Sequence, residues 1–209
     1  MPDPAKAPQM GTILILNGAS SSGKTTLLRL LQNQLAEPYL EAGIDKFIWM
    51  LPKRYLDVPH WHEIFEYRWH EQAGERRLEI CAGPQGKVLF SGMHQAIAAL
   101  AWGGNNVLAD HVLIEPEWVA ECARLFAGLP AYLIGIRCSL EILEERERAR
   151  EDRTLGQARA YHEKVHAHAL YDLEVDTGRD DPGTCARQII DFLAAGPAPR
   201  AFPALRWQT

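Results

Sequence analysis

The feature that most constrains the fold is a glycine- and serine-rich segment that directly follows a run of apolar residues. Residues 18–25 read Gly-Ala-Ser-Ser-Ser-Gly-Lys-Thr and fit the phosphate-binding pattern G-x-x-x-x-G-K-[ST]. The run before it, TILILN at 12–17, is typical of a strand buried on both faces, and leucines at helical spacing follow in 25–35. A strand, such a loop and a helix in this order predict a nucleoside triphosphate site.

Each residue type in this loop suits phosphate binding. The glycines let backbone N–H groups turn toward phosphate oxygens, Lys24 can reach the β- and γ-phosphates, and the Thr25 hydroxyl is a candidate Mg²⁺ ligand. The alternative is a turn that binds nothing. Because the chain has no N-K-x-D guanine-reading motif, ATP is the expected nucleotide. The expected nucleotide-binding residues are Gly18, Ala19, Ser20, Ser21, Ser22, Gly23, Lys24, Thr25 and Thr26.

Apolar runs and helical patterns alternate along the rest of the chain. Strands are expected at 42–48, 107–113, 131–137 and 173–176, and helices at 94–101, 117–126, 140–150, 155–169 and 184–195. Strands that alternate with helices favour βαβ units on a parallel sheet, and therefore an α/β fold.

The length of 209 residues suits one large domain. We expect a disordered lead-in at 1–11, a single domain at 12–195 with a lid region at 137–155, and a proline-rich tail without regular structure at 196–209. The tail still carries apolar side chains that could dock on the domain, namely Phe202, Leu205 and Trp207.

Composition excludes several classes of protein. The formal charge of −5 lacks the basic excess that nucleic-acid binding needs. The four cysteines form no C-x-x-C pair and are expected to be reduced thiols. No apolar run is long enough to span a bilayer and the start has no signal-peptide pattern, so a cytoplasmic protein with no membrane partner is expected.

Two aspartates close the predicted strands nearest to the loop. Asp45 ends the run AGID, where a carboxylate could accept the proton of an attacking substrate hydroxyl. A helix cap or a solvated turn is the alternative. Asp110 follows Val-Leu-Ala and resembles a short Walker B aspartate that holds Mg²⁺, although a plain strand-end aspartate gives the same signal.

A basic segment follows the strand predicted at 131–137, which ends at Arg137. The run ERERAREDR adds Arg146, Arg148, Arg150 and Arg153, of which Arg146 and Arg150 share a helix face. In small kinases, a basic segment here closes over the triphosphate and neutralises charge on the transferred group. The alternative is a solvated helix with i, i+4 ion pairs. The pattern does not show which arginine acts.

The stretch 53–93 is expected to be an insertion on the substrate side. Its part 53–87 is polar, rich in Trp, His and Arg, and shows no strand pattern. Trp61, Phe65 and Trp69 recur at helical spacing. That spacing is typical of core packing under the insertion, and a wall of the substrate pocket is the functional alternative.

A competing metal motif lies near the C-terminus. His162-Glu-Lys-Val-His166 matches the H-E-x-x-H pattern of zinc proteases, with His168 and Glu174 as further candidate ligands. The chain has eight histidines, so a chance pairing is easy, and the surrounding helix is charged. We therefore expect solvated or partner-contacting histidines and no zinc.

Taken together, several segments resemble the chloramphenicol phosphotransferase family of P-loop kinases. They are ILNGASSSGKTTL, EPYLEAGIDKF, VLADHVLI, GIRCSLEILEERERAREDR and VHAHALYDLEVDT, in order over most of residues 12–193. The resemblance implies the fold of nucleoside monophosphate kinases and shikimate kinase, a five-stranded parallel sheet in the order 2-3-1-4-5 flanked by helices. It also implies that ATP phosphorylates a primary hydroxyl of the antibiotic, with Asp45 as the matching general base and residues 176–184 beside the adenine. The chain departs from the family between Trp49 and His94, where the substrate walls lie.

The expected function is an ATP- and Mg²⁺-dependent O-phosphotransferase of a small molecule, with a chloramphenicol-type antibiotic as one candidate acceptor. The expected catalytic residues are Asp45, Lys24, Arg146 and Arg150, and the expected metal ligands are Thr25 and Asp110. Two alternatives stay open: a kinase of another metabolite, nucleoside or sugar nucleotide, and a nucleotide-binding switch without catalysis. The oligomeric state is not readable, and a homodimer or higher assembly is compatible with the sequence.

Overall fold

The computed structural model describes residues 10–57, 60–72, 75–150, 155–168 and 170–206. Most of the expected lead-in at 1–11 lies outside the described residues, as do Arg153 of the lid region and Trp207 of the tail.

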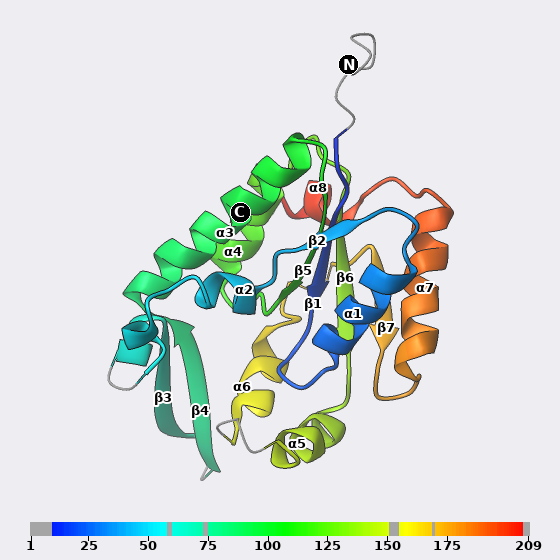
Figure 1. Cartoon of the computed structure of the whole chain (residues 1–209). Helices are drawn as coiled ribbons and strands as arrows, with labels where there is room; N and C mark the ends of the chain where they lie inside the picture. Colours follow the sequence, from blue (N-terminus) through cyan, green and yellow to red (C-terminus); the bar gives the residue numbers. More distant parts are fainter. Residues whose placement is uncertain (1–9, 58–59, 73–74, 151–154, 169, 207–209) are drawn as a thin grey trace.

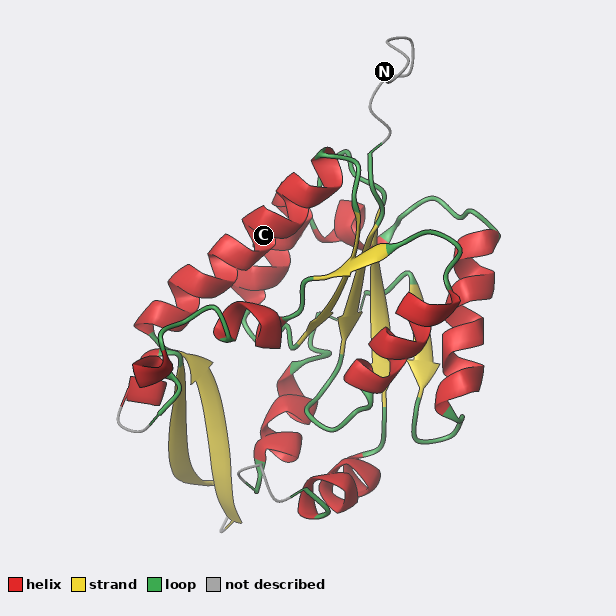
Figure 2. Ribbon diagram, in the orientation of Figure 1, coloured by secondary structure: helices red, strands yellow, loops and turns green. Residues whose placement is uncertain are grey.

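A five-stranded parallel sheet forms the centre of the molecule (Figures 1 and 2). Its strands are β1 (Ile13–Asn17), β2 (Tyr39–Glu41), β5 (Asn106–His111), β6 (Ala131–Arg137) and β7 (Leu173–Asp176). They lie in the order β2-β5-β1-β6-β7, which is 2-3-1-4-5 when the five are numbered along the chain. The predicted fold class and strand order are confirmed. β1 takes the central position because every one of its side chains is apolar or bonded inside the protein, and all are buried.

Helices cover both faces of this sheet (Figure 1). The helices of the described residues are α1 (Lys24–Gln34), α2 (Ile44–Ile48), α3 (Pro84–Trp102), α4 (Pro116–Leu125), α5 (Leu140–Arg148), α6 (Gln157–Lys164), α7 (Pro182–Ala194) and α8 (Ala201–Leu205), besides two short 3-10 helices, Lys53–Tyr55 and His60–Glu63. Of these, α5 and α6 lie beyond the ends of the strands in Figure 1.

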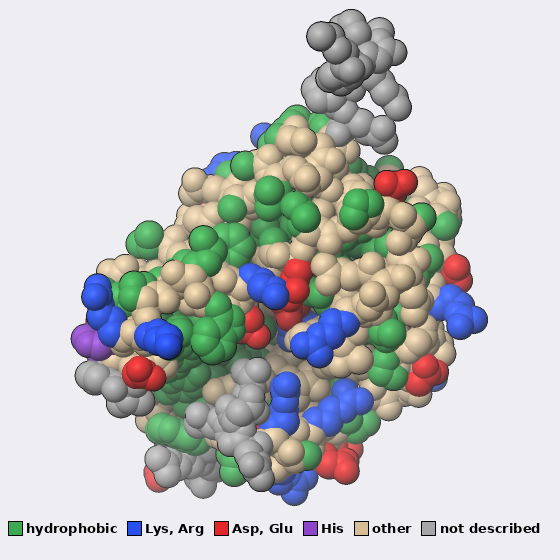
Figure 3. Space-filling model, viewed as in Figure 1, with side chains coloured by type: hydrophobic (Ala, Val, Ile, Leu, Met, Phe, Trp, Pro, Cys, Tyr) green, Lys and Arg blue, Asp and Glu red, His purple; other side chains and the backbone are tan. Residues whose placement is uncertain are grey.

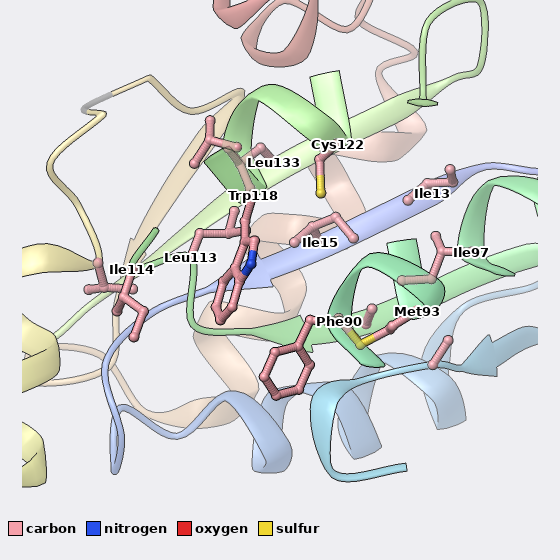
Figure 4. Close-up of a cluster of buried hydrophobic side chains, with 14 of the residues drawn as sticks. Ile13, Ile15, Phe90, Met93, Ile97, Leu113, Ile114, Trp118, Cys122 and Leu133 are labelled. Carbon is pink, nitrogen blue, oxygen red and sulfur yellow. The ribbon is translucent and has the colours of Figure 1, made fainter. Parts of the chain in front are cut away.

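Successive residues of β1 face opposite layers, as the two-residue period of a strand requires. Ile13 and Ile15 belong to the core under α3 and α4, where Figure 4 shows Phe90 and Trp118 close by. The leucines between and after them pack against α1 and α7. One strand therefore anchors both layers and carries the phosphate-binding loop at its end.

The expected strand at 42–48 is wrong. The nearest strand, the short β2, ends at Glu41, and the chain then turns at Gly43 into helix α2. Ile44, Phe47 and Ile48 stand at helical spacing, so the apolar run that suggested a strand is the inner face of a helix turn. Asp45 lies in the first turn of α2, where the helix dipole favours a negative charge.

The expectation that 53–87 holds no strand is also wrong. β3 (Phe65–Gln72) and β4 (Glu75–Ala82) form an antiparallel hairpin that stands apart from the central sheet in Figure 1. The spacing of four between Phe65 and Trp69 suggested a helix, but an even spacing also keeps two residues on one face of a strand. Phe65 packs on Phe90 of α3 with ring centroids 5.3 Å apart, which fixes the base of the hairpin on the core.

The proline-rich tail is more regular than expected, because α8 forms within it. The Asp172 carboxylate accepts hydrogen bonds from the backbone N–H groups of Arg200 (2.6 Å) and Ala201 (3.1 Å). Phe202 packs on Phe126, the residue that follows α4, with ring centroids 5.3 Å apart, and Leu205 is buried. These two side chains dock as predicted. In the part of the chain that the structure describes, no helix is long and apolar enough to cross a membrane.

Candidate active site

A cavity of about 510 Å³ opens at the carboxyl ends of the central strands. The phosphate-binding loop and the start of α1 form one side of it, and α2, the hairpin and α5–α6 form the others. Figure 3 shows a hollow on this face with hydrophobic side chains on one side and acidic and basic side chains around the other. A polar end and an apolar end thus share one cavity.

The phosphate-binding loop has the backbone of an anion cradle. Ser21 (φ 64°) and Gly23 (φ 85°) adopt the left-handed conformation, and Gly23 begins α1 with no side-chain cap. The first N–H groups of a helix have no intrahelical acceptor, so they are available to a phosphate. The hydroxyl oxygens of Ser21 and Ser22 are buried and have no hydrogen-bond partner within the described residues. These orphaned groups fit phosphate oxygens as their partners.

Lys24 is buried inside this loop. Its Nζ donates hydrogen bonds to the carbonyl oxygens of Gly18 (2.8 Å) and Ala19 (2.7 Å). The bonds hold the ammonium group within the loop, where a β- or γ-phosphate could be its counter-ion. All nine expected nucleotide-binding residues lie on this loop or the first turn of α1, and Ser20 to Thr26 line the cavity.

Thr25 and Asp110 meet as the metal-site prediction requires. Thr25 Oγ1 lies 3.3 Å from Asp110 Oδ2 and donates to it. Burial raises the pKa of Asp110, nearby Asp45 and Glu41 raise it further, and Lys24 opposes them. Hydroxyl and carboxylate oxygens are the donors that Mg²⁺ prefers, and a cation here would favour the ionised carboxylate. This donor set therefore fits Mg²⁺.

Gly43 determines how closely α2 approaches Asp110. A Cβ at Gly43 would lie only 1.8 Å from Asp110 Oδ1, so no other residue fits without moving the carboxylate. Sequence reasoning did not single out this glycine. The sequence feature that could have indicated its role is its position directly before the apolar run that forms α2.

Asp45 lines the cavity although its secondary structure differs from the expectation. β2 pairs with the first half of β5, ending at Glu41 beside Leu108. Gly43 then lies against Asp110 near the carboxyl end of β5, so the first turn of α2 carries Asp45 to that edge of the sheet. The side chain is exposed to solvent. An exposed carboxylate opposite a phosphate cradle is where a general base for an incoming hydroxyl is needed.

The arginines of the lid region divide into two groups. Arg146 and Arg150 line the cavity. Arg146 donates to the carbonyl oxygen of Thr177 (2.8 Å) and reaches Ser21 O (3.5 Å), beside the phosphate-binding loop. Arg137 instead pairs with Glu174 outside the cavity lining. Arg148 bonds the backbone of its own helix.

The apolar end of the cavity comes from five separate parts of the chain: α2, the 3-10 helix His60–Glu63, β3, the segment after β5 and α6. Trp61 and Phe65 face it, so the pocket-wall interpretation of the insertion applies to these two aromatic residues in addition to core packing. Tyr67 Oη accepts hydrogen bonds from Trp61 Nε1 (3.3 Å) and Gln157 Nε2 (3.2 Å). Other members of this wall are Ile44, Ile48, Val112, Ile114 and Tyr161. The sequence offered Tyr67 only as one of several aromatic residues of the insertion, and it did not point to Gln157 or Tyr161, because only tertiary packing brings them here.

The H-E-x-x-H segment lies outside this cavity. His166 Nδ1 contacts Tyr171 Oη, which also accepts a hydrogen bond from Asn17 Nδ2 (2.9 Å). Burial and the positive charge of Arg137 lower the pKa of His166 to about 3. Within the ranges that the structure describes, no three His, Cys, Asp or Glu side chains gather as metal ligands.

The fold is that of P-loop kinases. The chain is similar to a sugar kinase from Janibacter sp. HTCC2649 (TM-score 0.62, 17% identity, 90% of this chain and 97% of that one). It is also similar to the APS kinase of Mycobacterium tuberculosis, solved with AMPPNP and APS (TM-score 0.57, 15% identity, 90% and 99%). Shikimate kinase from Aquifex aeolicus superposes with a TM-score of 0.55 at 18% identity, over 89% of this chain and 100% of that one.

The family follows from the sequence comparisons. Residues 11–194 match the model of the chloramphenicol phosphotransferase-like proteins. The chain is 35% identical over 199 residues to proteins of two Mycobacterium tuberculosis strains that are provisionally named O-phosphotransferases, covering 94% of this chain and 88% of theirs. The protein belongs to the chloramphenicol phosphotransferase-like family and is a kinase, as the resemblance predicted.

Proposed function

We propose that the protein transfers the γ-phosphoryl group of ATP, with Mg²⁺, to a hydroxyl group of a small molecule that has an apolar or aromatic body. The observation that carries the proposal is the divided cavity: the phosphate-binding loop, Lys24 and two aspartates lie at one end, and an aromatic wall lies at the other. Membership of the family supports the reaction type.

In this proposal the residues of the chain position charge, and they take part in no covalent intermediate. The acceptor oxygen attacks the γ-phosphorus, the bond from that phosphorus to the β–γ bridging oxygen breaks, and Asp45 takes the hydroxyl proton. Lys24 and the loop N–H groups hold the phosphates, while Thr25 and Asp110 would hold Mg²⁺, which supplies positive charge when bound. Arg146 and Arg150 offset the charge on the transferred group.

The charge distribution in the cavity favours an uncharged acceptor. Its cationic side chains come from the phosphate-binding loop and the lid region, whereas the described residues of α2, the hairpin and the segment after β5 contribute none to the lining. An acceptor carboxylate or phosphate would lack a counter-ion at that wall. An alcohol with a flat apolar group, as in an antibiotic of the chloramphenicol type, suits it better than a sugar nucleotide.

The experiment is mass spectrometry of candidate acceptors after incubation with the protein, ATP and Mg²⁺. The panel should contain neutral aromatic alcohols, including chloramphenicol, beside nucleosides, sugar nucleotides and hydroxy acids. We expect a gain of one phosphoryl group on a neutral alcohol, and no gain with Lys24→Ala, which removes a phosphate-binding cation. Transfer only to anionic acceptors would contradict the proposed acceptor class. ATP binding without transfer to any acceptor would favour a nucleotide-binding switch.

A further inference from the structure

Glu147 is a buried carboxylate in the lid region, next to Arg146. Its side chain is 2% exposed, whereas the neighbouring Glu145 is exposed to solvent. A carboxylate leaves water at a large cost unless it accepts hydrogen bonds or pairs with a cation. The position of Glu147 therefore needs an explanation, which its partners supply.

Both oxygens of Glu147 accept backbone hydrogen bonds from the start of α6. Oε2 accepts from Gly156 N at 2.8 Å, and Oε1 accepts from Ala158 N at 2.7 Å. Gly156 caps α6 in a left-handed conformation (φ 97°) and offers no side-chain cap of its own. Glu147 thus caps one helix from another, and its charge lies at the positive end of α6.

The two helices that Glu147 joins contribute residues to opposite ends of the cavity. α5 carries Arg146, which lies against the phosphate-binding loop. α6 carries Gln157 and Tyr161 of the apolar wall, and Gln157 bonds Tyr67 of the hairpin. α6 is tied to the hairpin again by the ion pair of Lys164 with Glu79 (2.8 Å). A shift of α6 relative to α5 would change the distance between acceptor wall and arginine.

We propose that Glu147 is a positioning residue, which sets Arg146 relative to the acceptor wall by holding the start of α6. The inference rests on the proposed function, because it assigns Arg146 and that wall to the same reaction. Glu147 does not line the cavity and touches no reacting group. It acts through the backbone N–H groups of Gly156 and Ala158. A carboxylate is required, because each of these two donors needs an acceptor and a carboxylate offers one acceptor oxygen to each.

Glu144 provides a matched control. It also joins α5 to α6, through an ion pair with Arg159 (2.7 Å), but both side chains are partly exposed. Exposed ion pairs contribute little to stability. Glu147→Gln and Glu144→Gln are therefore the same chemical change on the same helix, and only the first places an amide N–H against a backbone N–H.

The test compares steady-state kinetics and hydrogen exchange of the two variants with the wild-type protein. We expect Glu147→Gln to lower kcat by about 10- to 100-fold and to raise the acceptor KM, with ATP affinity nearly unchanged. Peptides that contain Gly156 and Ala158 should exchange faster in this variant. Glu144→Gln should match the wild type in both measurements. Glu147→Asp keeps the charge but shortens the side chain by one methylene group. Its kcat should therefore lie between those of the wild-type protein and Glu147→Gln.

A double-mutant cycle with Arg146→Lys separates positioning from a general structural role. If Glu147 acts through Arg146, the combined loss in kcat is smaller than the product of the two separate losses. The proposal would be overturned if Glu147→Gln and Glu144→Gln lowered kcat equally. It would also be overturned if the loss of kcat in the double mutant equalled the product of the two separate losses. If the wild-type protein phosphorylates no acceptor, the proposed function fails instead, and unchanged exchange in Glu147→Gln would still overturn the role of Glu147.

Discussion

At the scale of single residues, two aspartates of the candidate site are held by different means. Asp45 stands in the first turn of α2, where the helix dipole stabilises its charge by about 0.3–1 kcal/mol. Asp110 is placed by contact: it bonds Thr25 on one side and fills the space above Gly43 on the other. A substitution at Gly43 should therefore move the Asp110 carboxylate and weaken the proposed Mg²⁺ site, although no charged residue is replaced.

Gly43→Ala tests this contact. The added methyl group would lie 1.8 Å from Asp110 Oδ1, so the carboxylate or α2 must move. We expect a loss of about 1–3 kcal/mol in the free energy of unfolding and a reduced affinity for Mg²⁺ in the kinase assay. Urea denaturation and Mg²⁺ titration measure the two effects.

Gly92→Ala is the control for this change. Gly92 lies inside α3, and a Cβ there meets nothing within 4 Å. Alanine should stabilise this helix by about 0.5–1 kcal/mol and leave activity alone. If Gly43→Ala behaves like Gly92→Ala, the close approach of Gly43 to Asp110 is not a constraint on the site.

At the scale of elements, a buried histidine pair connects α3, α4 and β5. His94 Nδ1 meets Glu121 Oε2 (2.7 Å), and His94 Nε2 meets His111 Nε2 (2.8 Å). Val112 N donates to His111 Nδ1 (2.8 Å), so a neutral His111 carries its proton on Nε2 and a neutral His94 carries its own on Nδ1. Every donor then has an acceptor, and an extra proton on either ring would set two donors against each other.

This pair predicts a loss of stability in mild acid. Burial holds the pKa of His94 below its ordinary value of about 6.5. The unfolded chain takes up a proton below that pH and the folded chain does not, so stability falls as pH drops below about 6.5. The slope is at most about 1.4 kcal/mol per pH unit for each such group. Urea unfolding at several pH values between 7.5 and 5.5 measures it.

His94→Gln should make this pH dependence shallower, because it removes one buried ring, while His111, His166 and His168, whose pKa values burial also lowers, still contribute. His70→Gln should not, because His70 is an exposed residue of the hairpin and lies in solvent in both states. A wild-type profile without slope over this range, or a slope that His94→Gln leaves unchanged, would contradict the neutral assignment of the pair.

The hairpin is the second element with a consequence for function. Tyr67 Oη joins β3 to α6 through Gln157 and to Trp61 beside it. Tyr67→Phe keeps the ring and removes these bonds, each worth about 0.5–1.5 kcal/mol. Under the proposed function, the acceptor KM should rise about 2- to 10-fold while the ATP KM stays the same. An ATP KM that rises equally would show that Tyr67 does not belong to the acceptor wall alone.

At the scale of the whole molecule, the parts that sequence could predict are those with local causes. The strand, loop and helix around Lys24 are contiguous, and each has its own pattern. The strand order came from the family resemblance, which the topology confirms. α2 was mistaken for a strand because a five-residue helix shows little more than one turn of its period. The hairpin was missed because a spacing of four suits both a helix and one face of a strand.

The phosphate end of the candidate site could be predicted from the sequence, whereas at the acceptor end only Trp61 and Phe65 of the insertion were candidates. The reason is again whether the cause is local. The phosphate end consists of one loop and of residues at strand ends, which a parallel sheet must bring together. The acceptor wall needs Tyr67 of the hairpin to meet Gln157 of α6, residues far apart in sequence whose contact depends on tertiary packing. No local pattern encodes that contact.

In the proposed reaction, Asp45 takes the proton of the acceptor hydroxyl inside the cavity. Asp45→Asn keeps the size of the side chain and most of its hydrogen-bonding geometry, but it cannot accept a proton at neutral pH. The measurement is acceptor-dependent ADP release together with ATP affinity. We expect turnover to fall by about 10²- to 10⁴-fold while ATP binds nearly as before. An Asp45→Asn protein with intact ATP binding and wild-type turnover toward its acceptor would contradict this role of Asp45.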